Sequence, residues 1–130
     1  MRSFKTIVLP ICLTGIWINI SETIRWVFLI EAYWIKYYDK LDLIFPSESI
    51  NTIIWVIWGF LFATIIFALS KKFNLLMTTI LSWFAVFVMM WLVVWNVGIL
   101  PIEMLWYNVP LSLFETFIGA LICKTIVKDK

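Results

Sequence analysis

The chain has 130 residues, of which 64% are hydrophobic, and its formal net charge is only +2. Soluble domains are about 45–50% apolar, and a soluble domain of this length has too little interior to bury so much apolar surface. The composition therefore excludes a soluble globular domain. It predicts a single transmembrane domain over residues 1–130, of the all-α class, solvated by lipid.

The residue types also argue against several kinds of chemistry. The chain has no histidine, and its two cysteines, Cys12 and Cys123, lie far apart in the sequence. We therefore expect neither a metal nor a cofactor. No Gly-rich phosphate loop or nucleophile motif is present, so we do not expect an enzyme. The basic residues are too few for a nucleic-acid partner.

The first predicted helix covers about residues 4–30. Arg2 and Lys5 precede an apolar run, as in a signal peptide, but no small-residue cleavage site follows, so we expect an uncleaved helix. Its small and polar residues fall on one helical stripe: Cys12, Gly15, Asn19 and Glu22. Arg25 lies three residues beyond Glu22 and within its reach. We predict an ion pair between the two; the alternative is that Arg25 contacts an anion or a lipid head group.

The second and third helices are predicted at about residues 49–70 and 73–96. Residues 49–70 are uncharged and long enough to span a bilayer. The pair Lys71–Lys72 ends this segment and leaves only a tight turn before the next helix. The two helices should therefore pack as an antiparallel pair. Asn96 marks the exit of the third helix.

Two connections, residues 31–48 and 97–108, are predicted to be loops on the same side of the membrane. The first helix has the option of continuing into residues 31–48, where Pro46 should break it. Residues 97–108 are either a short interfacial helix or the first turns of the fourth helix, kinked at Pro110. The fourth helix itself is predicted at about residues 104–127.

Charge is distributed unequally between the two predicted sides. The side with both termini and the Lys71–Lys72 turn carries seven basic residues and one acidic residue, whereas the other side carries two basic and five acidic residues. The positive-inside rule therefore places both termini in the cytoplasm. The predicted fold is an up-down-up-down four-helix bundle in the cell (cytoplasmic) membrane, and its multi-pass chain has the lipid bilayer as its direct partner.

Glu115 lies near the middle of the fourth helix, nine residues before Lys124, which is roughly 13 Å along a helix. A carboxylate at this depth costs ~2.5–3.5 kcal/mol on insertion scales, so we expect it to face the bundle interior. We predict an intramembrane polar site made of Glu115, Ser112, Asn19 and Asn96. With no basic residue nearby in its own helix, we expect Glu115 to be protonated at neutral pH.

Three function classes are compatible with these features. The first choice is a binding or accessory protein for lipid, an apolar ligand or a larger membrane complex. The alternative is a small oligomeric proton-coupled transporter that uses Glu115. The third choice is a membrane enzyme. Whether the carboxyl group of Glu115 is functional or structural, and whether the chain forms a homo-oligomer, stay open at this point.

Overall fold

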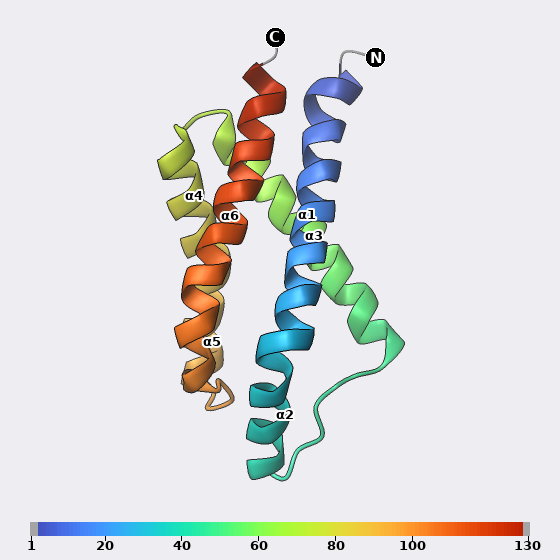
Figure 1. Cartoon of the computed structure of the whole chain (residues 1–130), viewed down its shortest axis with the longest axis vertical. Coiled ribbons are helices and arrows are strands. Elements are labelled where there is room, and N and C mark those ends of the chain that lie inside the picture. Colours follow the sequence, from blue (N-terminus) through green and yellow to red (C-terminus); the bar gives the residue numbers. More distant parts are fainter. Residues whose placement is uncertain (1–2, 129–130) are drawn as a thin grey trace.

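The computed structural model describes residues 3–128, which form four helical segments and contain no strand. The expectation of an all-α chain with four helices is confirmed. All four segments are long and apolar enough to cross a membrane. Consecutive segments run in opposite directions, so the start of the first helix and the end of the fourth lie at the same end of the molecule (Figure 1).

The first helix is longer than the expected residues 4–30, because it continues without a break over Phe4–Lys40. It consists of η1 (Phe4–Val8), α1 (Leu9–Arg25), η2 (Trp26–Ile30) and α2 (Glu31–Lys40). Residues 31–40 are polar but include no glycine or proline, so nothing in them breaks a helix. The expected outer loop 31–48 is thus reduced to residues 41–48. The backbone turns at Asp42, whose φ is 55°.

At 1.5 Å per residue, the 37 residues of the first helix extend about 55 Å, nearly twice the ~30 Å hydrocarbon layer. The charged segment α2 therefore extends beyond the apolar part of the bundle.

The second helix, α3 (Ser49–Ser70), occupies the predicted residues. The third helix covers Leu75–Asn96 and consists of α4 (Leu75–Trp83), η3 (Phe84–Val88) and α5 (Met89–Asn96). Side-chain caps fix where both helices begin. Glu48 and Asn51 form a capping box at the start of α3, and the Asn74 side chain accepts a hydrogen bond from the Met77 amide at the start of α4.

The fourth helix covers Ile102–Val127 as a membrane-length segment. It consists of η4 (Ile102–Met104) and α6 (Leu105–Lys128). Pro110 lies inside α6 without ending it. Of the two options for residues 97–108, the structure therefore has the first turns of the fourth helix. The expected loop 97–108 is reduced to a short turn around Gly98, whose φ is 79°.

Close contact between α1 and α3 depends on two glycines. A Cβ atom at Gly15 would lie 2.2 Å from a ring carbon of Phe60, and one at Gly59 would lie 2.6 Å from the Asn19 amide nitrogen. Small residues allow two helix backbones to approach in this way. Beyond this contact α3 diverges from α1 toward its own start (Figure 1). Only the later half of α3 supplies buried residues, from Gly59 to Ser70.

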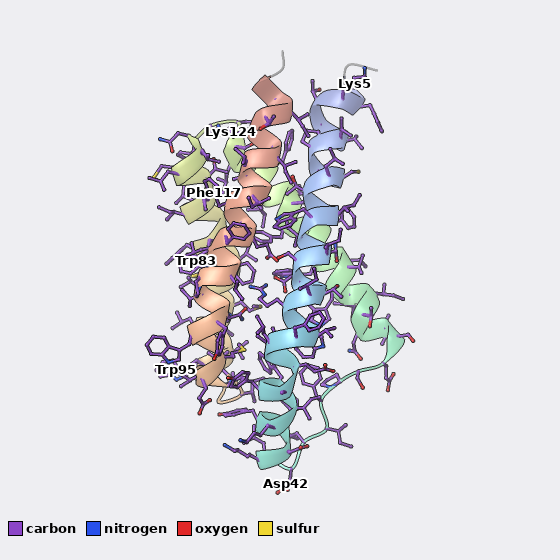
Figure 2. All side chains as sticks on the ribbon, in the orientation of Figure 1. Lys5, Asp42, Trp83, Trp95, Phe117 and Lys124 are labelled. Atoms are coloured by element: carbon purple, nitrogen blue, oxygen red, sulfur yellow. The ribbon has the colours of Figure 1, made fainter. Side chains whose placement is uncertain are left out.

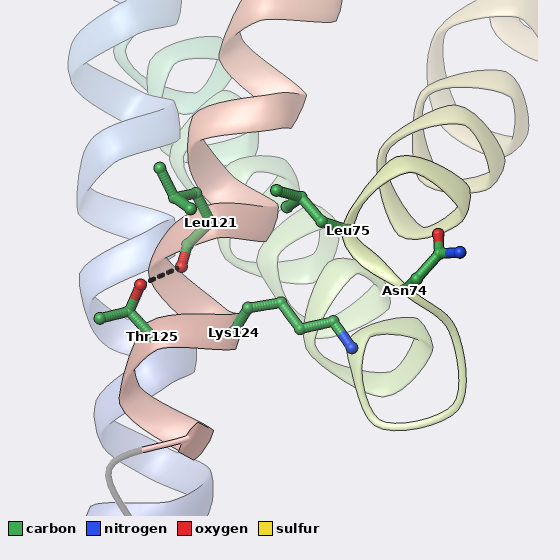
Figure 3. Close-up of a pocket in the computed structure, with 5 residues that line it drawn as sticks. All are labelled: Asn74, Leu75, Leu121, Lys124 and Thr125. Atoms are coloured by element: carbon green, nitrogen blue, oxygen red, sulfur yellow. Dashed lines mark hydrogen bonds between the residues drawn. The ribbon is translucent and has the colours of Figure 1, made fainter.

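Lys124 ties the fourth helix to the end of the second. Its ammonium group donates hydrogen bonds to the backbone carbonyls of Ser70 and Phe73. Ser70 is the last residue of α3, where helices leave backbone acceptors unpaired, and Phe73 lies in the turn that follows. The Lys124 side chain borders a pocket of about 280 Å³ and extends toward the turn that precedes Leu75 (Figure 3).

The two ends of the molecule differ in charge. Figure 2 shows Lys5 and Lys124 at one end and Asp42 at the opposite end. We call these the lysine end and the Asp42 end.

Candidate functional site

Glu115 and Arg25 meet in the interior of the bundle. The Glu115 side chain is 0% exposed and the Arg25 side chain 4%. Arg25 Nη2 lies 3.6 Å from Glu115 Oε2, and the same nitrogen forms the predicted ion pair with Glu22 Oε1. One guanidinium group therefore lies between two carboxyl groups. We call Glu22, Arg25 and Glu115 the triad.

Glu115 has no basic residue nearby in its own helix, but the first helix supplies a cation, Arg25. That Glu115 is protonated at neutral pH stays a prediction. The first and fourth helices pack side by side, and this brings Arg25 to a residue 90 positions away in the sequence. If both carboxyl groups were ionised, the triad would carry a net charge of −1 inside an apolar bundle. An uncompensated buried charge is expensive. One proton on either carboxyl group would make the triad neutral.

Aromatic side chains surround the guanidinium group. The Arg25 Cζ atom lies 5.3 Å from the centre of the Phe87 ring, which is within the range of a cation–π interaction. Phe87 in turn contacts three further rings: Trp58, Phe62 and Trp91. The Trp17 indole donates a hydrogen bond of 2.9 Å to the backbone carbonyl oxygen of Glu115. The charged groups are thus held in an aromatic interior.

Ser112, one of the predicted site residues, lies one turn before Glu115 on the buried face of α6. Its hydroxyl accepts a hydrogen bond of 2.8 Å from the Trp83 indole and donates one of 3.0 Å to the Val109 carbonyl. Ser112 therefore connects the third and fourth helices next to the triad.

Asn19 and Asn96, also predicted as partners of Glu115, lie elsewhere. The Asn19 amide donates to the carbonyls of Gly15 and Val56 and so links α1 to α3. Asn19 and Arg25 are six residues apart, which places them about 120° apart around the helix axis; they face different neighbours. Asn96 is exposed at the end of α5, whereas Glu115 is buried.

Seven buried side-chain atoms have no hydrogen-bond partner among the described residues. They are Arg25 Nε and Nη1, Glu115 Oε1 and Oε2, Ser82 Oγ, Trp91 Nε1 and Asn108 Oδ1. Four of the seven belong to the triad. Such a group costs about 1–3 kcal/mol when it stays unsatisfied, and ordered water usually satisfies it. The interior around Arg25 therefore offers free donors and acceptors to water or a small polar species.

Sequence reasoning missed Asn108, Trp91 and the two indole donors. Asn108 lies both at the end of the predicted loop 97–108 and inside the predicted fourth helix 104–127, and Asn108, Ser112 and Glu115 follow the spacing i, i+4, i+7 of one helix face. That spacing was the available signal. No comparable signal identified the indole groups of Trp17 and Trp83, because their partners lie on another helix.

Two π-helical turns adjoin the site. The segment η2 begins directly after Arg25, and η3 includes Phe87. π-turns inside α-helices are rare and occur frequently at functional sites. Within residues 3–128, no three His, Cys, Asp or Glu side chains are grouped so as to hold a metal ion. The chemistry available here is therefore that of carboxyl groups, one guanidinium group and indole donors.

Comparisons of the chain with protein-family models, with curated proteins and with solved structures found no match, so the geometry of the triad is the basis for a functional proposal.

Proposed function

We propose that this chain is an integral protein of the cell membrane, with both termini in the cytoplasm, whose triad takes up and releases one proton in proton-coupled transport. The orientation is supported by the positive-inside rule. Lys5 and Lys124 lie at the lysine end (Figure 2), and Lys71–Lys72 lie in the turn whose flanking carbonyls, at Ser70 and Phe73, bind Lys124. The proton site is supported by one observation above all: Arg25 lies between two carboxyl groups in the interior.

Charge balance favours a proton over an anionic ligand. Arg25 already faces two carboxyl groups, so an added anion would make the negative charge of the triad larger. A proton makes it neutral, and it needs no more space than the triad already has. Arg25 is also close enough to pair with either Glu22 or Glu115. The carboxyl group that is less well paired at a given moment is the one that takes the proton.

A purely structural role fits the triad less well. A buried ion pair repays its desolvation only when additional hydrogen bonds satisfy its remaining donors and acceptors. Here Arg25 Nε and Nη1 and both carboxyl oxygens of Glu115 have no such partner among the described residues. Ionisable residues that face the interior of a membrane-spanning bundle typically mark proton and ion pathways.

Proton flux into sealed vesicles tests the proposal. The purified protein is reconstituted with a pH-sensitive dye inside, and a membrane potential is applied. We expect inward proton flux above that of empty vesicles, and its loss in Glu115→Gln, which keeps the shape of the side chain but cannot ionise. Asp39→Asn is the matched control, because Asp39 is exposed on α2. Flux that is no larger than in empty vesicles, or that survives Glu115→Gln, would contradict the proposal.

A binding or accessory role is the second candidate, and one observation favours it. The early half of α3 diverges from the bundle (Figure 1) and exposes a row of large apolar side chains: Ile50, Ile53, Ile54, Trp55 and Ile57. Lipid or a helix of a larger membrane complex would cover this row. A partner protein that co-purifies at fixed stoichiometry, and is lost when Ile53 and Ile57 are changed to alanine, would favour this candidate. The expectation that the chain is not an enzyme stays a prediction.

A further inference from the structure

Buried polar groups differ on the two sides of the triad. On the lysine-end side, threonine hydroxyls are satisfied by backbone carbonyls. Thr14 donates to Gly119, Thr79 to Leu75, and Thr116, directly after Glu115, to Ser112. Two large apolar side chains that are 0% exposed, Ile18 and Ile66, lie in the same half. This half of the interior is therefore apolar and has few free polar atoms for water.

The Asp42 side of the triad has free polar atoms instead. Asn108 is 4% exposed, and its Oδ1 has no partner among the described residues. It lies seven residues before Glu115 on the same face of α6, roughly 10 Å toward the Asp42 end. Trp91 is 7% exposed, with a free indole Nε1, and lies one turn beyond Phe87 in the same direction.

One further feature points to the Asp42 end. A pocket of about 310 Å³ opens at this end, lined in part by Tyr33, Lys36 and Glu103. Glu103 lines this pocket and precedes Asn108 by five residues on the fourth helix. The free polar atoms of Trp91 and Asn108 thus lie between the triad and this end of the molecule.

We infer that Arg25, Trp91 and Asn108 form a hydrated site that binds water, and that the triad exchanges its proton through this water with the Asp42 end while the lysine-end half is closed. The inference rests on the proposed function and assigns it a direction. Each buried water needs two to four polar partners, and each of these three residues has a buried side-chain atom without a partner among the described residues. Ser82 Oγ is also free but lies outside this route. Ser82 precedes Trp83, whose indole donates a hydrogen bond to Ser112.

Hydrogen–deuterium exchange of indole groups tests the hydrated site in the unmodified, full-length protein. After transfer to D2O, the indole N–H of Trp91 is followed by nuclear magnetic resonance, with Trp17 and Trp83 as internal controls because both are hydrogen-bonded. We expect Trp91 to exchange at least about tenfold faster than either control, as free hydrated donors do. Exchange of Trp91 that is as slow as that of the controls would overturn the inference.

A matched pair of variants tests the direction. The infrared stretch of a protonated carboxyl group shifts on deuteration, so its rate of shift in D2O measures water access to the triad. Asn108→Leu, which removes the free oxygen and fills its space, should slow this shift by at least about tenfold. Ser82→Ala should leave the rate unchanged. The reverse result would place the route on the lysine-end side and overturn the inference.

The outcomes separate the route from the proposed function. Fast exchange of Trp91 together with absent proton flux would keep the hydrated site and contradict transport. Proton flux together with slow exchange of Trp91 would keep transport and contradict the route. The indole measurement needs no variant, so it tests the hydrated site even if Asn108→Leu does not fold.

Discussion

Replacing both carboxyl groups of the triad should lower the free energy of unfolding by more than the two single replacements together. Arg25 is 4% exposed and lies within reach of Glu22 and Glu115. In Glu22→Gln the guanidinium still faces Glu115, and in Glu115→Gln it still faces Glu22. Each single change therefore leaves a neutral pair, and we expect it to lower the free energy of unfolding by only about 1 kcal/mol, the net value of one hydrogen bond.

The double variant Glu22→Gln/Glu115→Gln leaves Arg25 buried without any carboxylate. Breaking a buried ion pair on one side costs about 3–5 kcal/mol, because it leaves an uncompensated charge. The expected loss thus exceeds the sum of the single losses by roughly 1–3 kcal/mol, which is in the range of coupled neighbouring sites.

Unfolding in mixed micelles with an increasing fraction of denaturing detergent is followed by circular dichroism. It gives the free energy of unfolding of the unmodified protein, the two single variants and the double variant. Arg25→Met in the double-variant background is the control: it removes the unpaired cation and should recover part of the lost stability. Strict additivity of the two glutamine substitutions would refute the reasoning, since it would mean that the carboxyl groups act on Arg25 independently.

Two further predictions rest on the contacts of single residues, and a third rests on the distribution of charge. Gly15→Ala should destabilise the protein by about 1–3 kcal/mol, because its Cβ would overlap the Phe60 ring; Gly119→Ala, whose nearest neighbour would lie at 3.1 Å, should cost less, and equal losses in thermal unfolding would contradict this. Lys124→Met should lower the free energy of unfolding by about 1–2 kcal/mol, because it removes the hydrogen bonds to two backbone carbonyls. The same change at exposed Lys72 should be nearly neutral, and unfolding in detergent compares the two variants. With Cys12 and Cys123 replaced by serine, a cysteine at Asp42 should react with an impermeant reagent outside intact cells and one at Lys72 should not; external labelling at position 72 would reverse the orientation.

The number and class of the elements could be predicted from the sequence because long apolar runs report directly on membrane-length helices. The end of the first helix could not, because polar residues such as Glu31 and Lys36 are compatible both with a loop and with a continued helix. Polarity does not end a helix; a backbone break does, and the first one comes near Asp42. The fourth helix, Ile102–Val127, lies close to the predicted residues 104–127, and Pro110 is accommodated within it.

The candidate site was predictable only within each helix. The Glu22 and Arg25 pair follows from a spacing of three residues, and the interior position of Glu115 follows from the cost of a charge in lipid. The meeting of Arg25 with Glu115 depends on how α1 packs on α6, which no local pattern encodes. For the same reason Asn19 was assigned to Glu115, although its face of the helix contacts α3.

Infrared spectroscopy of the carboxyl groups at neutral pH tests the central claim most directly, namely that Glu22 and Glu115 share one proton around Arg25. The unmodified protein should show the stretch of one buried protonated carboxyl group. Glu115→Gln should remove this band, and so should Glu22→Gln, because either variant leaves one carboxylate for one guanidinium group. A band that persists in Glu22→Gln would show that Glu115 is protonated by its apolar surroundings alone, and a missing band in the unmodified protein would show that both carboxyl groups are ionised. Either result would contradict the shared proton.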